Sequence, residues 1–219
     1  MMNLRRRVFS LVFLLAGACA HAGAYDDFFA AVRQDDAQTV RNLLQRGFDP
    51  NTPDAKGLSA MFIAVREPSP KVAAVLIDWP STQVETRTAQ DESPLMIASI
   101  QGQIDMVKRL IARGADVNKP GWTPLHYAAS RGQIEVMRLL LENHAYIDAA
   151  SPNNTTPLMM AARYGSDEAV RLLLEEGADP MPRNDLGMTA IDFAQGVNRG
   201  TAADLIAEAI RARQPKGKW

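Results

Sequence analysis

The chain has 219 residues, of which 47% are hydrophobic and 22% are charged, and its formal net charge is −1 at pH 7. These proportions are those of an ordinary folded, soluble protein. The near balance of charge excludes the strongly basic character of proteins that bind nucleic acid or membrane surfaces, and we expect neither activity.

The first 22 residues have the three-part pattern of a secretory signal peptide. Three arginines, Arg5–Arg7, precede an apolar run from Val8 to Ala18, and small residues follow. The run is shorter than the roughly 20 residues that a helix needs to span a bilayer. We therefore predict a cleaved signal peptide over residues 1–22, in preference to a buried first helix or a membrane span.

The segment Ala20-His21-Ala22 fits the small-x-small pattern of a cleavage site, as do the overlapping triplets that end at Ala20 and Ala24. Cleavage near Ala22 leaves 21 basic and 25 acidic residues, a net charge of −4. We expect the mature protein to be exported, and a bacterial periplasm fits the arginine-rich leader best.

Cys19 is the only cysteine and lies inside the predicted leader. Leu15–Cys19 faintly resembles a bacterial lipoprotein box, but Ala16 stands where that motif prefers Leu, so we do not expect a lipid anchor. Loss of Cys19 leaves a mature chain without thiols, which excludes disulfides and thiolate metal sites. A cysteine-free chain suits an oxidising compartment.

Two atypical helix pairs come first in the predicted mature chain. Asp26 and Asp27 favour the start of a helix electrostatically, and we expect this pair to cap one end of an array. In the second pair, Pro68 and Pro70 crowd the turn between helices, where proline is tolerated.

A clearer pattern begins at Thr123, where the chain reads T-P-L-H-Y-A. Thr123 can cap a helix with Pro124 in its first turn, and Gly132 can end it. A second apolar stripe follows over residues 134–141. One such pair cannot bury both of its faces, so it needs similar neighbours.

Those neighbours are present in register. The capping residues recur at successive gaps of 34, 30, 33 and 33 residues, at Ser59, Ser93, Thr123, Thr156 and Thr189.

The T-P-L-H-x-A signature, together with Gly114–Asn118 as G-A-D-V-N, resembles the ankyrin repeat from about Asp26 to Arg211. The resemblance implies an all-α solenoid of about six helix-turn-helix units with short β-hairpin fingers. The domain is expected over residues 23–211, followed by a basic disordered tail at 212–219. Its repeats are expected near residues 26–54, 55–88, 89–119, 120–151, 152–184 and 185–211.

One finger is shorter than the others. The step from Asn118 to the next cap, Thr123, is five positions, whereas the corresponding step elsewhere is eight. The loss falls in Lys119–Trp122. Loops of such arrays vary to suit partners, so the shortening is either functional, exposing Trp122, or a neutral deletion.

No sequence pattern for catalysis is present: the chain lacks a phosphate-binding P-loop, a G-x-S-x-G elbow and an H-E-x-x-H motif. The resemblance implies that His126 is structural and bonds the backbone of the adjoining finger. His144 occupies a turn position held by Gly in other copies. We predict no enzyme activity, no cofactor and no metal site.

In the ankyrin family, partners usually bind the concave face made by the fingers and the first helices, at variable positions beside the T-P-L-H motif and before the inter-helix Gly. Trp, Tyr and Arg at such positions are typical of binding hot spots. Alternatively, Ile100 and Trp122 fill space left by the short finger. The predicted partner-binding residues are Ile100, Gln101, Trp122, Arg131, Arg163 and Tyr164.

The resulting hypothesis is a monomeric, non-catalytic module that binds an unknown protein partner in the bacterial envelope. Small exported bacterial ankyrin proteins are similar to two kinds of binder. One is an accessory factor to a periplasmic enzyme, such as a catalase, or to a stress system. The alternative is an immunity protein that neutralises an envelope-acting toxin, and a remote alternative is an enzyme.

Overall fold

The computed structural model describes residues 23–213. The predicted leader with Cys19 lies outside these residues, as do residues 214–219 of the predicted tail. The described part consists of short helices joined by turns, with one isolated antiparallel bridge between Pro53 and Ser59. It forms two compact units that meet in the sequence between Thr88 and Ala89, the predicted limit between the second and third repeats.

The first unit contains two helix pairs. Helical residues 23–33 pair with α2 (Ala37–Gln45), and α3 (Ala60–Arg66) pairs with α4 (Pro70–Asp78). Pro70 occupies the first turn of α4, as its sequence position predicts. The Ser69 side chain makes no capping bond there; the Asp35 carboxylate, from the turn before α2, instead accepts a bond from Val72 N at 2.9 Å. This bond links the two helix pairs of the unit.

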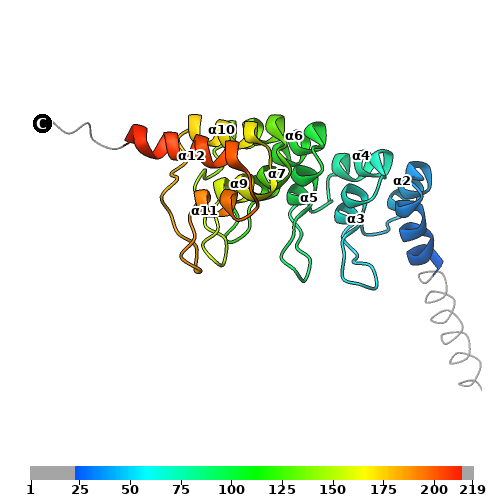
Figure 1. Cartoon of the computed structure of the whole chain (residues 1–219). Helices are drawn as coiled ribbons and strands as arrows, with labels where there is room; N and C mark the ends of the chain where they lie inside the picture. The colour runs from blue at the N-terminus through cyan, green and yellow to red at the C-terminus, as the bar shows by residue number, and fades with distance from the viewer. Residues whose placement is uncertain (1–22, 214–219) are drawn as a thin grey trace, which may run out of the picture. The chain divides into compact units, whose positions relative to one another are not determined.

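The second unit contains four helix pairs in two layers. The first helices lie side by side in one layer and the second helices in the other, with the fingers projecting from the first layer (Figure 1). The first helices are α5 (Pro94–Ile100), α7 (Pro124–Arg131), α9 (Pro157–Tyr164) and α11 (Ala190–Gln195). The second helices are α6 (Ile104–Ala112), α8 (Ile134–Glu142), α10 (Asp167–Glu175) and α12 (Gly200–Arg213).

These six helix pairs of the described residues confirm the all-α repeat architecture. One boundary was predicted wrongly: α12 continues to Arg213, so the helical array extends past residue 211. The Arg213 guanidinium donates to Ala178 O at 2.8 Å and to Gly177 O at 3.1 Å. These bonds to the end of the preceding repeat extend α12 beyond the sequence motif.

The capping residues act as the sequence predicts. The side chains of Ser59, Ser93, Thr123 and Thr156 each accept a bond from the backbone N–H three residues later. At Thr189 the carboxylate of Asp192 accepts from the Thr189 N–H and hydroxyl instead. Each first helix of these five repeats therefore starts at the same point of its repeat.

The core is built from equivalent apolar positions of successive repeats. Leu95, Leu125 and Leu158 on the first helices are fully buried, and so are Leu110 and Leu140 on the second helices. These leucines occupy equivalent positions in neighbouring repeats. The burial of one helix pair therefore depends on the pairs beside it.

Polar side chains tie successive repeats together at the base of the fingers. Asn118 donates from Nδ2 to His144 O at 2.7 Å and accepts from Tyr146 N at 2.7 Å. Asn51 makes the same pair of bonds to the following repeat in the first unit. The amide side chain suits this position because it carries both a donor and an acceptor.

Asp148 occupies the equivalent position one repeat after Asn118 and can only accept when ionised. It accepts from Asp179 N at 3.0 Å. The side chain is exposed, but the surrounding backbone removes part of its hydration and so raises its pKa. The side chain therefore makes one inter-repeat bond where Asn makes two.

We predict that Asp148→Asn raises the free energy of unfolding by about 1 kcal/mol, since the amide can also donate toward Gly177 O without an ionic desolvation cost. Asn118→Asp is the matched reverse change and should lower it by a similar amount. Urea denaturation of both variants measures the effect. A loss of stability in Asp148→Asn would contradict this account of the inter-repeat bonds.

Candidate protein-binding surface

A hollow of about 240 Å³ lies on the exposed side of the first helices of the second unit, here called the first-helix face. Ile100 ends α5, Tyr127 and Ser130 lie on α7, Met160 lies on α9, and Trp122 lies in the short finger before α7. All five side chains are half-buried. They are held by packing and remain accessible from solvent.

Trp122 forms one wall of this hollow. Its ring meets the His126 ring edge-on, with centroids 5.2 Å apart and planes at 77°. The side chain is half-buried, so it is accessible in part beside the short finger. Contact with His126 on one side leaves the other part of the indole facing the hollow.

The short finger is held differently from the full-length fingers. Three full-length fingers are closed by a backbone bond, from Asp54 N to Leu58 O, from Ser151 N to Thr155 O and from Asn184 N to Met188 O.

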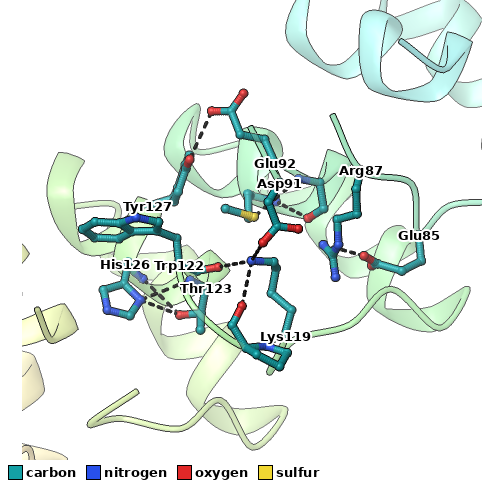
Figure 2. Close-up of polar contacts among 12 residues, drawn as sticks. Glu85, Arg87, Asp91, Glu92, Lys119, Trp122, Thr123, His126 and Tyr127 are labelled. Carbon is teal, nitrogen blue, oxygen red and sulfur yellow. Dashed lines mark hydrogen bonds and ion pairs between the residues drawn. The ribbon is translucent and has the colours of Figure 1, made fainter. Parts of the chain in front are cut away.

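In the short finger a buried lysine side chain, rather than a backbone bond, holds the loop closed. Lys119 is 3% exposed, and its Nζ donates to Pro120 O at 2.8 Å and to Trp122 O at 3.0 Å. The same Nζ pairs with the Asp91 carboxylate at 2.5 Å, and these contacts are drawn in Figure 2. Lys119 therefore fixes the backbone that carries Trp122.

His126 lies beneath the short finger and is fully buried. Its Nε2 donates to Thr155 O in the next finger at 2.9 Å, and its Nδ1 accepts from Thr123 N at 3.2 Å. Burial, and to a smaller extent the nearby Lys119 charge, lowers the His126 pKa to about 4. The ring is neutral at pH 7, and the predicted structural role is confirmed.

Two arginines stand at the carboxyl ends of neighbouring first helices. Arg131 is exposed at the end of α7, and the Arg163 guanidinium lies 5.3 Å from the centroid of the Tyr164 ring. Tyr164 is 59% exposed. In the described range 23–213, neither arginine is paired with a carboxylate. The end of α5 carries an exposed Gln101 at the corresponding place.

Comparison with known protein families agrees with this architecture. A family model described as ankyrin repeats matches residues 28–120, 118–184 and 144–209. The chain belongs to the ankyrin repeat family. Ankyrin repeats are typically non-catalytic scaffolds for protein–protein interaction, and the repeats of this chain indicate an interaction module.

Known ankyrin repeat proteins similar to this chain come from different organisms. A solved ankyrin repeat domain from Acinetobacter baumannii AYE has a TM-score of 0.72 and 26% identity, covering 82% of this chain and 95% of that one. The nuclear factor NF-kappa-B p105 subunit of Gallus gallus is 31% identical over 70% of this chain. The neurogenic locus notch homolog protein 2 of Homo sapiens is 35% identical over 54% of it. The matched regions are 16% and 5% of those two proteins.

The six residues predicted for partner binding do not all occupy one place. Ile100 and Trp122 line the hollow together. Four lie at the carboxyl ends of the first helices: Gln101, Arg131, Arg163 and Tyr164.

The six predicted residues leave out three that line the hollow: Ser130, and the pair Tyr127 and Met160. Both occupy the x of the T-P-L-H-x-A motif, and that position is half-buried on the first-helix face in both repeats. The signal was therefore present in the repeat motif itself. Leu186, at the tip of the last finger, is 80% exposed and was also missed.

Within residues 23–213 the structure contains no group of three or more His, Cys, Asp or Glu side chains placed to hold a metal ion. None of the helices in that range is long and apolar enough to cross a membrane.

The pKa of His126 predicts a pH dependence of stability. Between pH 6.5 and about 4 the unfolded chain binds a proton at His126 that the folded chain does not, so lowering the pH should reduce the free energy of unfolding. The expected loss is on the order of 3 kcal/mol across this window. Met is the matched replacement, because Met96 and Met159 accept the equivalent cap N–H in neighbouring repeats. His126→Met should show a flatter pH dependence, and an unchanged slope would contradict the assignment.

Removing the Lys119 ammonium should loosen the short finger. Lys119→Met leaves Pro120 O and Trp122 O without their donor and should lower the free energy of unfolding by about 2 kcal/mol. Trp122 fluorescence, measured with Trp79 and Trp219 replaced by Phe, should shift to longer wavelength.

Lys108→Met is the control for this change, because Lys108 is exposed on α6. Equal losses of stability in the Lys119 and Lys108 variants, with no change in Trp122 emission, would refute the positioning role of Lys119.

Proposed function

We propose that this ankyrin repeat chain is an exported module of a bacterial envelope that binds a protein partner through its first-helix face. The supporting observation is the hollow beside Trp122, next to two arginines without carboxylate partners in the described residues. Apolar and aromatic side chains that remain accessible beside arginine are the residue types that dominate binding energy at protein interfaces.

Export is supported by the sequence rather than by the described structure. The arginine-rich start, the short apolar run and the small residues before Gly23 form a signal-peptide pattern, and Cys19, the sole cysteine, lies within it. We propose a periplasmic location with the partner being an enzyme or a component of a stress system that the module supports. The similarity to a solved domain from a bacterium, Acinetobacter baumannii, is in keeping with this source.

Expression of the full chain in a Gram-negative host, followed by periplasmic extraction and amino-terminal sequencing, tests the location. The expected product is periplasmic and starts near Gly23. A soluble cytoplasmic product that retains the leader would contradict the proposal. Affinity capture from the periplasm then identifies the partner, an envelope enzyme if the role is accessory and a toxin if the role is immunity.

Single substitutions on the first-helix face should weaken binding of that partner. We expect Trp122→Ala and Tyr164→Ala each to weaken binding by about 2 kcal/mol, because both remove aromatic contact area from an accessible surface. Leu140→Ala, in the buried core, should instead lower the free energy of unfolding by roughly 2–5 kcal/mol.

Titration calorimetry gives the binding changes, and thermal unfolding gives the stability of the same variants. If Trp122→Ala destabilises the fold as much as Leu140→Ala while folded molecules still bind fully, Trp122 serves packing and the proposed surface is wrong.

A further inference from the structure

We propose that the hollow on the first-helix face receives one apolar side chain from a linear, acidic segment of the partner. The apolar side chain would sit among Ile100, Trp122 and Met160, and neighbouring carboxylates of the same segment would pair with Arg131 and Arg163. This inference rests on the proposed function, because it specifies the chemistry of the partner at the same surface.

The size of the hollow sets the size of the occupant. Its volume is about 240 Å³. A cavity of about 150 Å³ holds a benzene molecule, whereas sites for whole small-molecule ligands have roughly 300–1,000 Å³. The hollow therefore fits one aromatic or large aliphatic side chain and is small for a cofactor.

The two hydroxyl groups in the walls of the hollow already donate within the protein. The Tyr127 hydroxyl donates to Glu92 Oε1 at 3.1 Å, and the Ser130 hydroxyl donates to Tyr127 O at 2.8 Å. The other walls are Ile100, Trp122 and Met160. Both hydroxyl protons are already donated within the protein. Burial in the hollow therefore costs less free energy for an apolar group than for a polar group that finds no hydrogen-bond partner there.

The charge beside the hollow determines which residues we expect next to the apolar side chain in the partner segment. Arg131 and Arg163 are 32 residues apart, at the same end of the adjacent packed helices α7 and α9. Cations at these ends also interact favourably with the helix dipoles, but neither guanidinium has a carboxylate partner in the described residues. On the other side, Glu92 bonds Tyr127 and Asp91 pairs with Lys119. The Asp91 charge is offset by Lys119, and the positive charge of Arg131 and Arg163 at the helix ends favours carboxylates in the partner.

Selection of random short peptides displayed on phage against the immobilised full chain tests this inference without knowledge of the natural partner. We expect enrichment of peptides with one aromatic or large aliphatic residue beside Asp or Glu. Failure to enrich any linear peptide, or enrichment of basic or uniformly polar peptides, would overturn the inference.

Two matched pairs of variants test how a selected, synthesised peptide binds. Ser130→Phe fills the hollow and should weaken binding about tenfold or more, whereas Glu135→Phe on the outer helix α8 should not. Replacing Arg131 and Arg163 by Glu should weaken binding by a similar factor and reduce its sensitivity to salt. The same charge change at Arg138 and Arg171, exposed on α8 and α10, should leave it nearly unchanged.

Thermal unfolding of each variant checks that it folds. Equal effects of the two members of either pair would overturn the inference. If the natural partner is lost in Trp122→Ala but still binds the Ser130 and arginine variants, this inference fails and the proposed function stands. If no variant of the first-helix face affects the natural partner, the proposed function fails as well.

Discussion

Each helix pair in this chain carries apolar side chains on two faces, and a single pair cannot bury both. Leu125 and Leu140 are fully buried only because equivalent pairs lie on either side of them. The helix pair and the start of each first helix must therefore keep the same place in every repeat, whereas the fingers can differ in length. Capping by Thr123 and its counterparts supplies this constancy, because a hydrogen-bonded cap fixes the residue at which each helix begins.

Hydrogen bonds from one repeat to the next add specific, directional contacts to this apolar packing. His126 reaches the backbone of the following finger, and Asn118 bonds the base of that finger with both its donor and its acceptor. These side chains recognise backbone atoms rather than particular residues. The sequence of a finger is consequently free to vary while its position is kept, which allows the same scaffold to present different binding surfaces.

The shortened finger shows how such variation is accommodated. The short finger lacks the backbone bond that closes three of the full-length fingers, and the buried ammonium of Lys119 bonds two carbonyl groups in its place. A buried cation is costly unless it is fully paired, and Asp91 supplies the opposite charge. The finger therefore holds Trp122 against His126 and beside the hollow. The contacts that pack the finger also form one wall of the surface.

The sequence by itself determined the repeat, its register and the helix starts, because capping chemistry and apolar periodicity are local and recur from copy to copy. It also placed His126 correctly, and it located the short finger from spacing alone. The continuation of α12 to Arg213 did not follow from the sequence, since it depends on bonds to backbone of the preceding repeat.

Only the tertiary structure decided how the surface is assembled. Which side chains meet at the hollow depends on the packing of three first helices and a finger, and the inclusion of Tyr127 and Met160 is a consequence of that packing. The roles of Lys119 and of half-buried Trp122 depend on contacts that the deletion creates. A gap in spacing shows where the chain is shortened, but the groups that replace the lost bonds are set by distances in three dimensions.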